Sequence, residues 1–143
     1  MLPAREGDAI WVRWGEKCSP YQMLIDMGTE DMGKVLRQKI SALPEAQRIF
    51  EAIVVTHIDA DHIGGLLSFF VDSEKPPGVS VKDFWFNGYL HLDGRRSSST
   101  LEKLGAVQAE RLTNWLISQP WNTLLDGGSI CRREGEPLKV IEL

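Results

Sequence analysis

The chain has 143 residues, a formal net charge of −4 and a sequence pI near 5.4. Its hydrophobic fraction of 43% and charged fraction of 25% are ordinary for globular domains, so the composition favours neither a fibrous nor a disordered chain. The acidic balance argues against a surface built to coat nucleic acid, and no apolar run reaches the length of a membrane span. We therefore expect one soluble domain over residues 1–143, with no membrane partner.

The first third of the chain predicts two strands and a helix. Strand-like runs cover residues 9–12 and 21–25, joined by a hairpin-like connection over residues 15–20. After Gly28, apolar residues recur at three- and four-residue intervals until Pro44, which predicts a helix with one buried face. These apolar residues are Met32, Val35, Leu36, Ile40 and Leu43.

The middle of the chain predicts a strand, a helix and a second strand. Residues 53–55 form a short apolar run, which is typical of a strand buried on both faces. Residues 63–71 suit a helix whose glycines allow close approach to that strand. The chain then breaks at residues 76–78 (PPG), and residues 79–86 predict the next strand.

The last third predicts a loop, a long helix and a short strand. Residues 87–99 are polar and irregular, whereas Ser99 and Glu102 resemble a capping box. The box opens a helix over residues 101–116, and residues 138–141 are strand-like. We find no internal repeat or linker, so a single domain remains the expectation.

The two cysteines, Cys18 and Cys131, lie far apart and outside any CxxC motif. With no secretory segment ahead of them, this usage indicates free thiols in a reducing compartment. We therefore expect a cytoplasmic protein.

The run THIDADHIGG, residues 56–65, directly follows the predicted strand at residues 53–55 and places two of the three histidines and two aspartates within six residues. Neighbouring carboxylates repel each other, and their burial requires partners or a metal. Imidazole nitrogens and carboxylate oxygens together suit zinc, iron or manganese. Ligands also collect at the carboxyl ends of strands in layered α/β folds. The run therefore predicts a metal site.

The spacing suggests how this site is built. If the chain leaves the strand in an extended conformation, His57, Asp59 and Asp61 point to the same side, and His62 swings across as the helix begins. One short loop could then serve two adjacent cations, which would offset the repulsion between the two aspartates.

These residues allow two other interpretations. A histidine beside a strand is commonly a hydrogen-bonded structural residue, but four potential ligands in six residues favour metal binding. A calcium-binding EF-hand loop fits poorly, because counting from Asp59 places Phe70 where that loop needs a glutamate.

The same run resembles the signature of the metallo-beta-lactamase superfamily, which reads HxHxDH followed by glycine. The resemblance extends upstream to residues 24–28, LIDMG. It implies an α/β fold that is half of an αβ/βα sandwich, a mixed sheet with flanking helices. The family's remaining ligands come from the second half of that sandwich, so we expect residues 1–143 to lack the C-terminal half.

The resemblance also implies roles for single residues. His57 and Asp59 would bind the first of two divalent metal ions, and Asp61 and His62 the second, with zinc expected and manganese or iron as alternatives. Asp61 would act in catalysis by orienting the attacking water, and Asp26 would support the loop. A metal-bound hydroxide would then attack an ester, amide or phosphodiester.

Asp59 stands where the family usually has a second histidine. A similar HxDxDH pattern occurs in the hydrolase domains of competence-type DNA-uptake proteins. This resemblance implies a small-molecule or phosphodiester substrate, with nucleic acid included.

Three residues outside the motif are weaker candidates. His91 either approaches the site or is an ordinary loop or capping residue. Arg95 and Arg96 either contact substrate phosphates or only solvate the loop that carries them.

A rival hypothesis makes the chain a half-domain that is not catalytic alone. An open half-sandwich exposes its sheet face and edge, which favours pairing as a homodimer or with a complementing chain.

Overall fold

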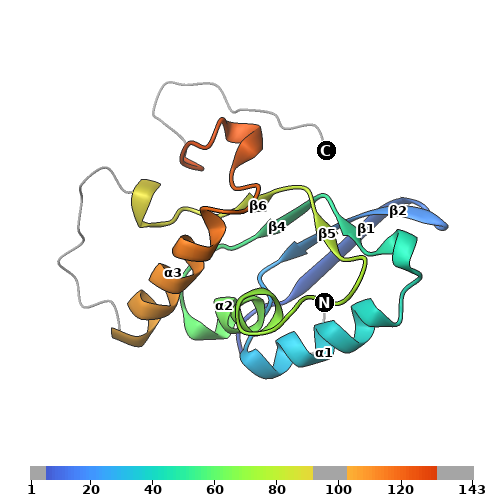
Figure 1. Ribbon diagram of the computed structural model, residues 1–143, viewed down its shortest axis with the longest axis horizontal. Coiled ribbons are helices and arrows are strands. Elements are labelled where there is room, and N and C mark those ends of the chain that lie inside the picture. Colours follow the sequence, from blue (N-terminus) through green and yellow to red (C-terminus); the bar gives the residue numbers. More distant parts are fainter. Residues whose placement is uncertain (1–5, 92–102, 132–143) are drawn as a thin grey trace.

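The computed structural model describes residues 6–91 and 103–131, and a four-stranded mixed sheet lies at its centre (Figure 1). The strand order is β1-β2-β4-β6. β1 and β2 are antiparallel, whereas β2, β4 and β6 run parallel to their neighbours. The strands are β1 Ile10–Glu16, β2 Ser19–Ile25, β4 Ala52–Val54 and β6 Phe84–Trp85.

The β1–β2 hairpin is tighter than the sequence predicted. The expected connection over residues 15–20 was wrong, because the strand ladder continues to the pair Glu16–Ser19. Gly15 has a φ of +83°, a conformation that side chains disfavour and glycine accepts. Beside it Trp14 and Tyr21 stack across the two strands, with ring centroids 5.7 Å apart. This cross-strand pair stabilises the hairpin up to its turn.

Residues 79–86 form two strands instead of the single strand predicted. β5 (Ser80–Val81) pairs in parallel with β3 (Ile49–Phe50), and together they make a separate two-stranded sheet. The chain changes sheets at the next two residues: the amide of Lys82 donates to Phe50, and the carbonyl of Asp83 accepts from Ile53 in β4. The sequence did not predict two strands because β3 and β4, the strands with which β5 and β6 pair, are distant in the sequence.

Three helices cover one face of the four-stranded sheet (Figure 1): α1 Glu30–Ser41, α2 Ala60–Leu66 and α3 Lys103–Leu116. α1 confirms the predicted helix and buries Met32, Leu36 and Ile40. The described part of α3 also confirms its prediction. The proposed capping box at Ser99 and the strand-like residues 138–141 lie outside the described residues.

Short helical turns complete the described chain. They are the 3₁₀ turns η1 Glu45–Gln47, η3 Tyr89–His91 and η4 Thr123–Leu125, and the π-helical turn η2 Leu67–Val71, which continues α2. No helix in residues 6–91 or 103–131 has both the length and the apolar composition of a membrane crossing.

α2 begins three residues earlier than predicted. The sequence suggested a helix from Ile63, but the structure starts it at Ala60, inside the THIDADHIGG run. The carbonyl of Asp59 accepts hydrogen bonds from the amides of His62 and Ile63, at 2.9 and 3.1 Å. Asp61 and His62 therefore belong to the first helical turn.

The core lies between the sheet and its three helices. Leu24 and Ile53 from the sheet, Leu36 from α1, Ile63 from α2 and Leu112 from α3 are fully buried. Burial of each such side chain stabilises the fold by about 1.5–3 kcal/mol.

Glycines bring α2 close to α1 and to the segment that precedes α1, whereas the sequence predicted a close approach to the strand at residues 53–55. A Cβ on Gly65 would lie 2.0 Å from the carbonyl oxygen of Met27, and one on Gly33 would lie 2.6 Å from the carbonyl oxygen of Gly65. Only a residue without a side chain fits at either position.

The sheet face opposite the helices, which we call the open sheet face, carries apolar side chains with partial exposure. Alternate residues of a strand point to opposite faces, so Tyr21, Met23 and Ile25 face away from buried Gln22 and Leu24. Tyr21 is 47% exposed. By strand register, the same face also carries Ile10, Val12, Trp14, Val54 and Trp85, all at least partly exposed.

Candidate metal centre

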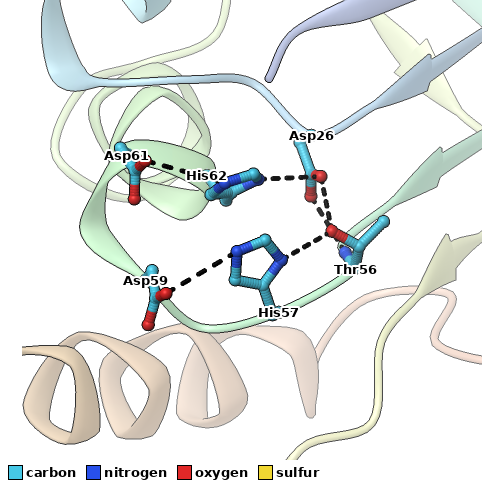
Figure 2. A network of polar contacts seen from close by, with 6 residues as sticks. All are labelled: Asp26, Thr56, His57, Asp59, Asp61 and His62. Carbon is cyan, nitrogen blue, oxygen red and sulfur yellow. Dashed lines mark hydrogen bonds and ion pairs between the residues drawn. The ribbon is translucent and has the colours of Figure 1, made fainter. Parts of the chain in front are cut away.

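The candidate metal centre lies where the parallel strands β2 and β4 end at the same edge of the sheet. Asp26 directly follows β2, and its amide donates to the carbonyl of Val54 at 2.8 Å. Thr56 and His57 follow β4 two residues later. Strand pairing therefore brings Asp26 beside a segment that lies 30 positions away in the sequence (Figure 2).

Asp26 is the buried centre of the polar network. Its side chain is 2% exposed and its φ of 52° is left-handed, a conformation in which aspartate is tolerated better than most residues. Oδ1 accepts from the amide of Thr56 at 2.9 Å, and Oδ2 accepts from the Thr56 hydroxyl at 2.6 Å. Oδ2 also lies 3.1 Å from Nδ1 of His62. Three contacts thus hold this carboxylate in place.

The two histidines of the motif lie ring against ring. The centroids of His57 and His62 are 3.6 Å apart, with a tilt of 46° between the rings. Nδ1 of His57 lies 2.9 Å from Oγ1 of Thr56, so both Nδ1 atoms face the network around Asp26 (Figure 2). The side chain of His57 is 45% exposed and that of His62 only 10%.

The opposite nitrogen of each histidine faces a carboxylate. Nε2 of His57 lies 3.7 Å from Oδ2 of Asp59, and Nε2 of His62 lies 3.7 Å from Oδ2 of Asp61 (Figure 2). The four residues of the motif therefore form two pairs side by side. We call these the His57–Asp59 pair and the His62–Asp61 pair.

The expected geometry of an extended loop was wrong in part. Asp59 is extended, with φ −67° and ψ 144°, but the helix begins at the next residue. Asp61 is therefore placed by the first turn of α2 and not by strand alternation. The two pairs lie side by side because the helical turn carries His62 back onto the ring of His57.

Main-chain contacts fix the start of α2 against its surroundings. The amide of Met27 donates to the carbonyl of His62 at 3.1 Å, and the amide of Gly65 donates to that of Gly28 at 2.7 Å. A Cβ on Gly7 would lie 1.8 Å from the carbonyl oxygen of Asp61, so the segment before β1 also lies against this turn. These contacts fix the positions of Asp61 and His62 in the first turn of α2.

A comparison with family models matches residues 21–128 to the metallo-beta-lactamase superfamily. The match includes Asp26 and the whole THIDADHIGG run. The chain belongs to the metallo-beta-lactamase superfamily. No curated protein and no solved structure gives a significant match. The mixed sheet with helices on one face agrees with part of the metallo-beta-lactamase sandwich, as the sequence predicted.

The donor set fits a divalent cation of the kind that metallo-beta-lactamase superfamily members bind. Asp26, His57 and His62 each place one potential ligand atom within 4.8 Å of the other two. Both oxygens of Asp26 already accept hydrogen bonds, which favours the supporting role that the resemblance implies for this residue. With Asp26 in that role, Asp59 and Asp61 are the carboxylates that remain beside the histidines as candidate ligands.

The 3.7 Å spacing within each pair, His57–Asp59 and His62–Asp61, supports the same conclusion. It is longer than a hydrogen bond between nitrogen and oxygen. Zinc–ligand bonds of about 2.0–2.2 Å in a tetrahedron put two ligands about 3.3–3.6 Å apart. Each pair therefore has nearly the separation of two ligands on one cation.

The weaker candidates of the sequence do not join the metallo-beta-lactamase motif in the described residues. Nε2 of His91 lies 3.0 Å from the carbonyl oxygen of Gly127, and its ring packs edge-on against Trp121 with centroids 4.6 Å apart. These contacts favour the interpretation of His91 as a structural loop residue. Arg95 and Arg96 lie outside the described residues.

Sequence reasoning missed two residues that shape the site. The sequence marks Thr56 only as part of the motif, although its hydroxyl contacts both Asp26 and His57. A hydroxyl residue next to a candidate ligand is a signal that could have identified it, because ligating histidines usually have such partners. Gly7 carries no comparable signal, since its contact with Asp61 arises only in the fold.

Proposed function

We propose that the chain is a metal-dependent hydrolase that holds two divalent cations. His57 and Asp59 bind one cation, Asp61 and His62 bind the other, and Asp26 supports both histidines. Membership of the metallo-beta-lactamase superfamily supports this proposal. The observation that carries it is the pairing of each Nε2 with a carboxylate oxygen at 3.7 Å.

The proposed chemistry is hydrolysis of an ester or phosphodiester. Cations bound here supply a Lewis acid for the scissile bond and lower the pKa of water. Oδ2 of Asp61 faces His62, and its other oxygen is free to accept a hydrogen bond from the attacking water and so orient it. Asp26 and Thr56 hold the histidine rings in place behind the reacting atoms.

Phosphodiesters, including nucleic acids, are the favoured substrates within this class. The HxDxDH resemblance supports that choice, and it is an argument from analogy. Zinc is the favoured metal, and the oxygen ligand from Asp59 keeps manganese and iron as alternatives. Cys18 and Cys131 are exposed and unpaired, which supports a location in the cytoplasm.

Metal analysis of the purified chain tests the proposal. We expect about two metal ions per wild-type chain and turnover of a chromogenic phosphodiester. The double variant His57→Ala/Asp61→Ala should lose both, with an unchanged far-ultraviolet circular dichroism spectrum. His91→Ala is the matched control and should keep its metal, because the contacts of His91 are with Gly127 and Trp121. Unchanged metal content in the double variant would overturn the proposal.

One observation favours a second candidate function, pairing with another chain. The open sheet face carries partly exposed aromatic and aliphatic side chains, among them Tyr21 and Val12, which are both exposed. Contiguous exposed apolar surface marks interaction sites in many proteins. A second copy or a complementing chain would cover this face with a sheet of its own, and the chain alone would then be inactive.

Sedimentation analysis separates the two candidates. Pairing predicts a concentration-dependent dimer that Tyr21→Lys weakens, whereas Lys17→Ala at the nearby hairpin turn leaves it unchanged. A monomer at all concentrations with full metal content and turnover would contradict the pairing function.

A further inference from the structure

The hydroxyl of Thr56 bridges a buried carboxylate and an exposed imidazole. Oγ1 donates to Oδ2 of Asp26 at 2.6 Å and lies 2.9 Å from Nδ1 of His57. The amide of Thr56 donates to Oδ1 of the same carboxylate at 2.9 Å. The backbone and side chain of one residue are thus both fixed by Asp26, which leaves the hydroxyl little freedom to rotate.

Counting protons assigns the direction of each hydrogen bond. A carboxylate only accepts, and a threonine hydroxyl has a single proton to donate. Because that proton goes to Asp26, Oγ1 must accept from His57, so Nδ1 of His57 carries a proton. By the same rule Nδ1 of His62 donates to Oδ2 of Asp26. In both neutral rings the lone pair is then at Nε2.

We propose that Thr56 is a positioning residue that fixes the Nδ1–H tautomer and the ring orientation of His57. Asp26 thereby sets both histidines, His62 by direct contact and His57 through the threonine hydroxyl. This inference deepens the proposed function, because its consequence for metal binding requires His57 to be a ligand. The tautomer itself is a property of the metal-free protein.

We call the connection from Asp26 through the Thr56 hydroxyl to His57 the relay. His57 depends on this hydrogen bond more than His62 depends on its own bond to Asp26. His62 is nearly buried, and the main chain of α2 holds it against Met27. His57 is 45% exposed and lies in a loop, so its ring has fewer packing contacts to restrict it. Without the hydroxyl, the proton is free to move to Nε2, where it would block the nitrogen that faces Asp59.

Nuclear magnetic resonance of the metal-free full chain, labelled with ¹⁵N-histidine, tests the relay directly. At a pH where imidazole is neutral, the nitrogen shifts report which ring nitrogen carries the proton. His62 is the internal reference for the Nδ1–H form. His91 is the reference for the Nε2–H form, because its Nε2 faces the carbonyl oxygen of Gly127 and must donate.

Thr56→Val removes the hydroxyl and keeps the shape of the side chain, whereas Thr56→Ser keeps the hydroxyl. We expect His57 to shift toward the pattern of His91 in Thr56→Val and to keep its wild-type pattern in Thr56→Ser. Zinc affinity should fall about 10–100-fold in Thr56→Val and change little in Thr56→Ser. Thr123→Val, a substitution at another exposed threonine, controls for the loss of a surface hydroxyl.

The outcomes separate this inference from the proposed function. An unchanged His57 tautomer in Thr56→Val, or an equal change in Thr56→Ser, overturns the relay even if the protein binds zinc. If the His57 tautomer changes in Thr56→Val but the wild-type protein takes up no zinc, the positioning role of Thr56 is supported and the hydrolase proposal is contradicted.

Discussion

Oδ2 of Asp26 lies 3.1 Å from Nδ1 of His62, although 36 positions separate the two residues in the sequence. The same oxygen accepts the hydroxyl of Thr56 at 2.6 Å. A single buried atom therefore connects the end of β2 to both histidines of the motif. A change at this atom should affect the whole candidate centre.

Asp26→Asn tests that dependence. Asparagine tolerates the left-handed backbone, with φ of 52°, but its neutral amide is a weaker acceptor for the Thr56 hydroxyl and His62. We expect zinc affinity, measured by competition with a chelator, to fall about 10–100-fold. Asp126→Asn is the control, because Asp126 is exposed and has a similar φ of 56°. Equal affinities in the two variants would contradict the supporting role.

The two histidine–aspartate pairs should bind zinc unequally. The side chains of His62 and Asp61 are 10% and 40% exposed, whereas those of His57 and Asp59 are 45% and 69% exposed. The more buried pair is held more rigidly and loses less conformational entropy on binding. A calorimetric zinc titration should therefore show two steps, of which Asp61→Asn removes the tighter and Asp59→Asn the weaker. The reverse assignment, or two identical steps, would refute this order.

Gly65→Ala should destabilise the fold at the α1–α2 crossing. The added Cβ would lie 2.0 Å from the carbonyl oxygen of Met27, so α2 must move away. We expect the free energy of unfolding in urea to fall by about 1–3 kcal/mol. Gly64→Ala is the neighbouring control and should cost less, since its nearest contact is 3.1 Å away at the amide nitrogen of Glu30. Stability losses in the opposite order would show that the crossing is looser than described.

Leu36→Ala should leave a cavity beneath the sheet. Leu36 is fully buried on the inner face of α1. The loss of its side chain should lower the free energy of unfolding by about 2–5 kcal/mol. Val107→Ala on the exposed side of α3 should change it by less than about 0.5 kcal/mol. A small effect at Leu36 would mean that the core rearranges to fill the space.

Local sequence patterns predicted much of this fold. The apolar stripe of α1 repeats over a full 12-residue helix, so one buried face was evident from spacing alone. The THIDADHIGG run was equally informative, since its four potential ligands are neighbours in the chain. The sequence therefore supported best the predictions that depend on residues close together in the chain.

Features that depend on distant partners were not predictable in the same way. β3 is only two residues long, and it exists because Ile49 and Phe50 meet β5 across the fold. The early start of α2 adds polar residues that have no apolar periodicity. The role of Thr56 likewise requires Asp26, which strand pairing brings to it from 30 positions away.

The main-chain contacts at the start of α2 also make the centre a scaffold for altered chemistry. The bonds from Met27 to His62 and from Gly65 to Gly28 use backbone atoms only, so they persist whatever side chains occupy positions 59, 61 and 62. Exchanging the side chains at positions 59 and 61 should alter metal preference and leave the contact between His62 and Asp26 in place, which makes this short turn a suitable starting point for engineering new cation specificities.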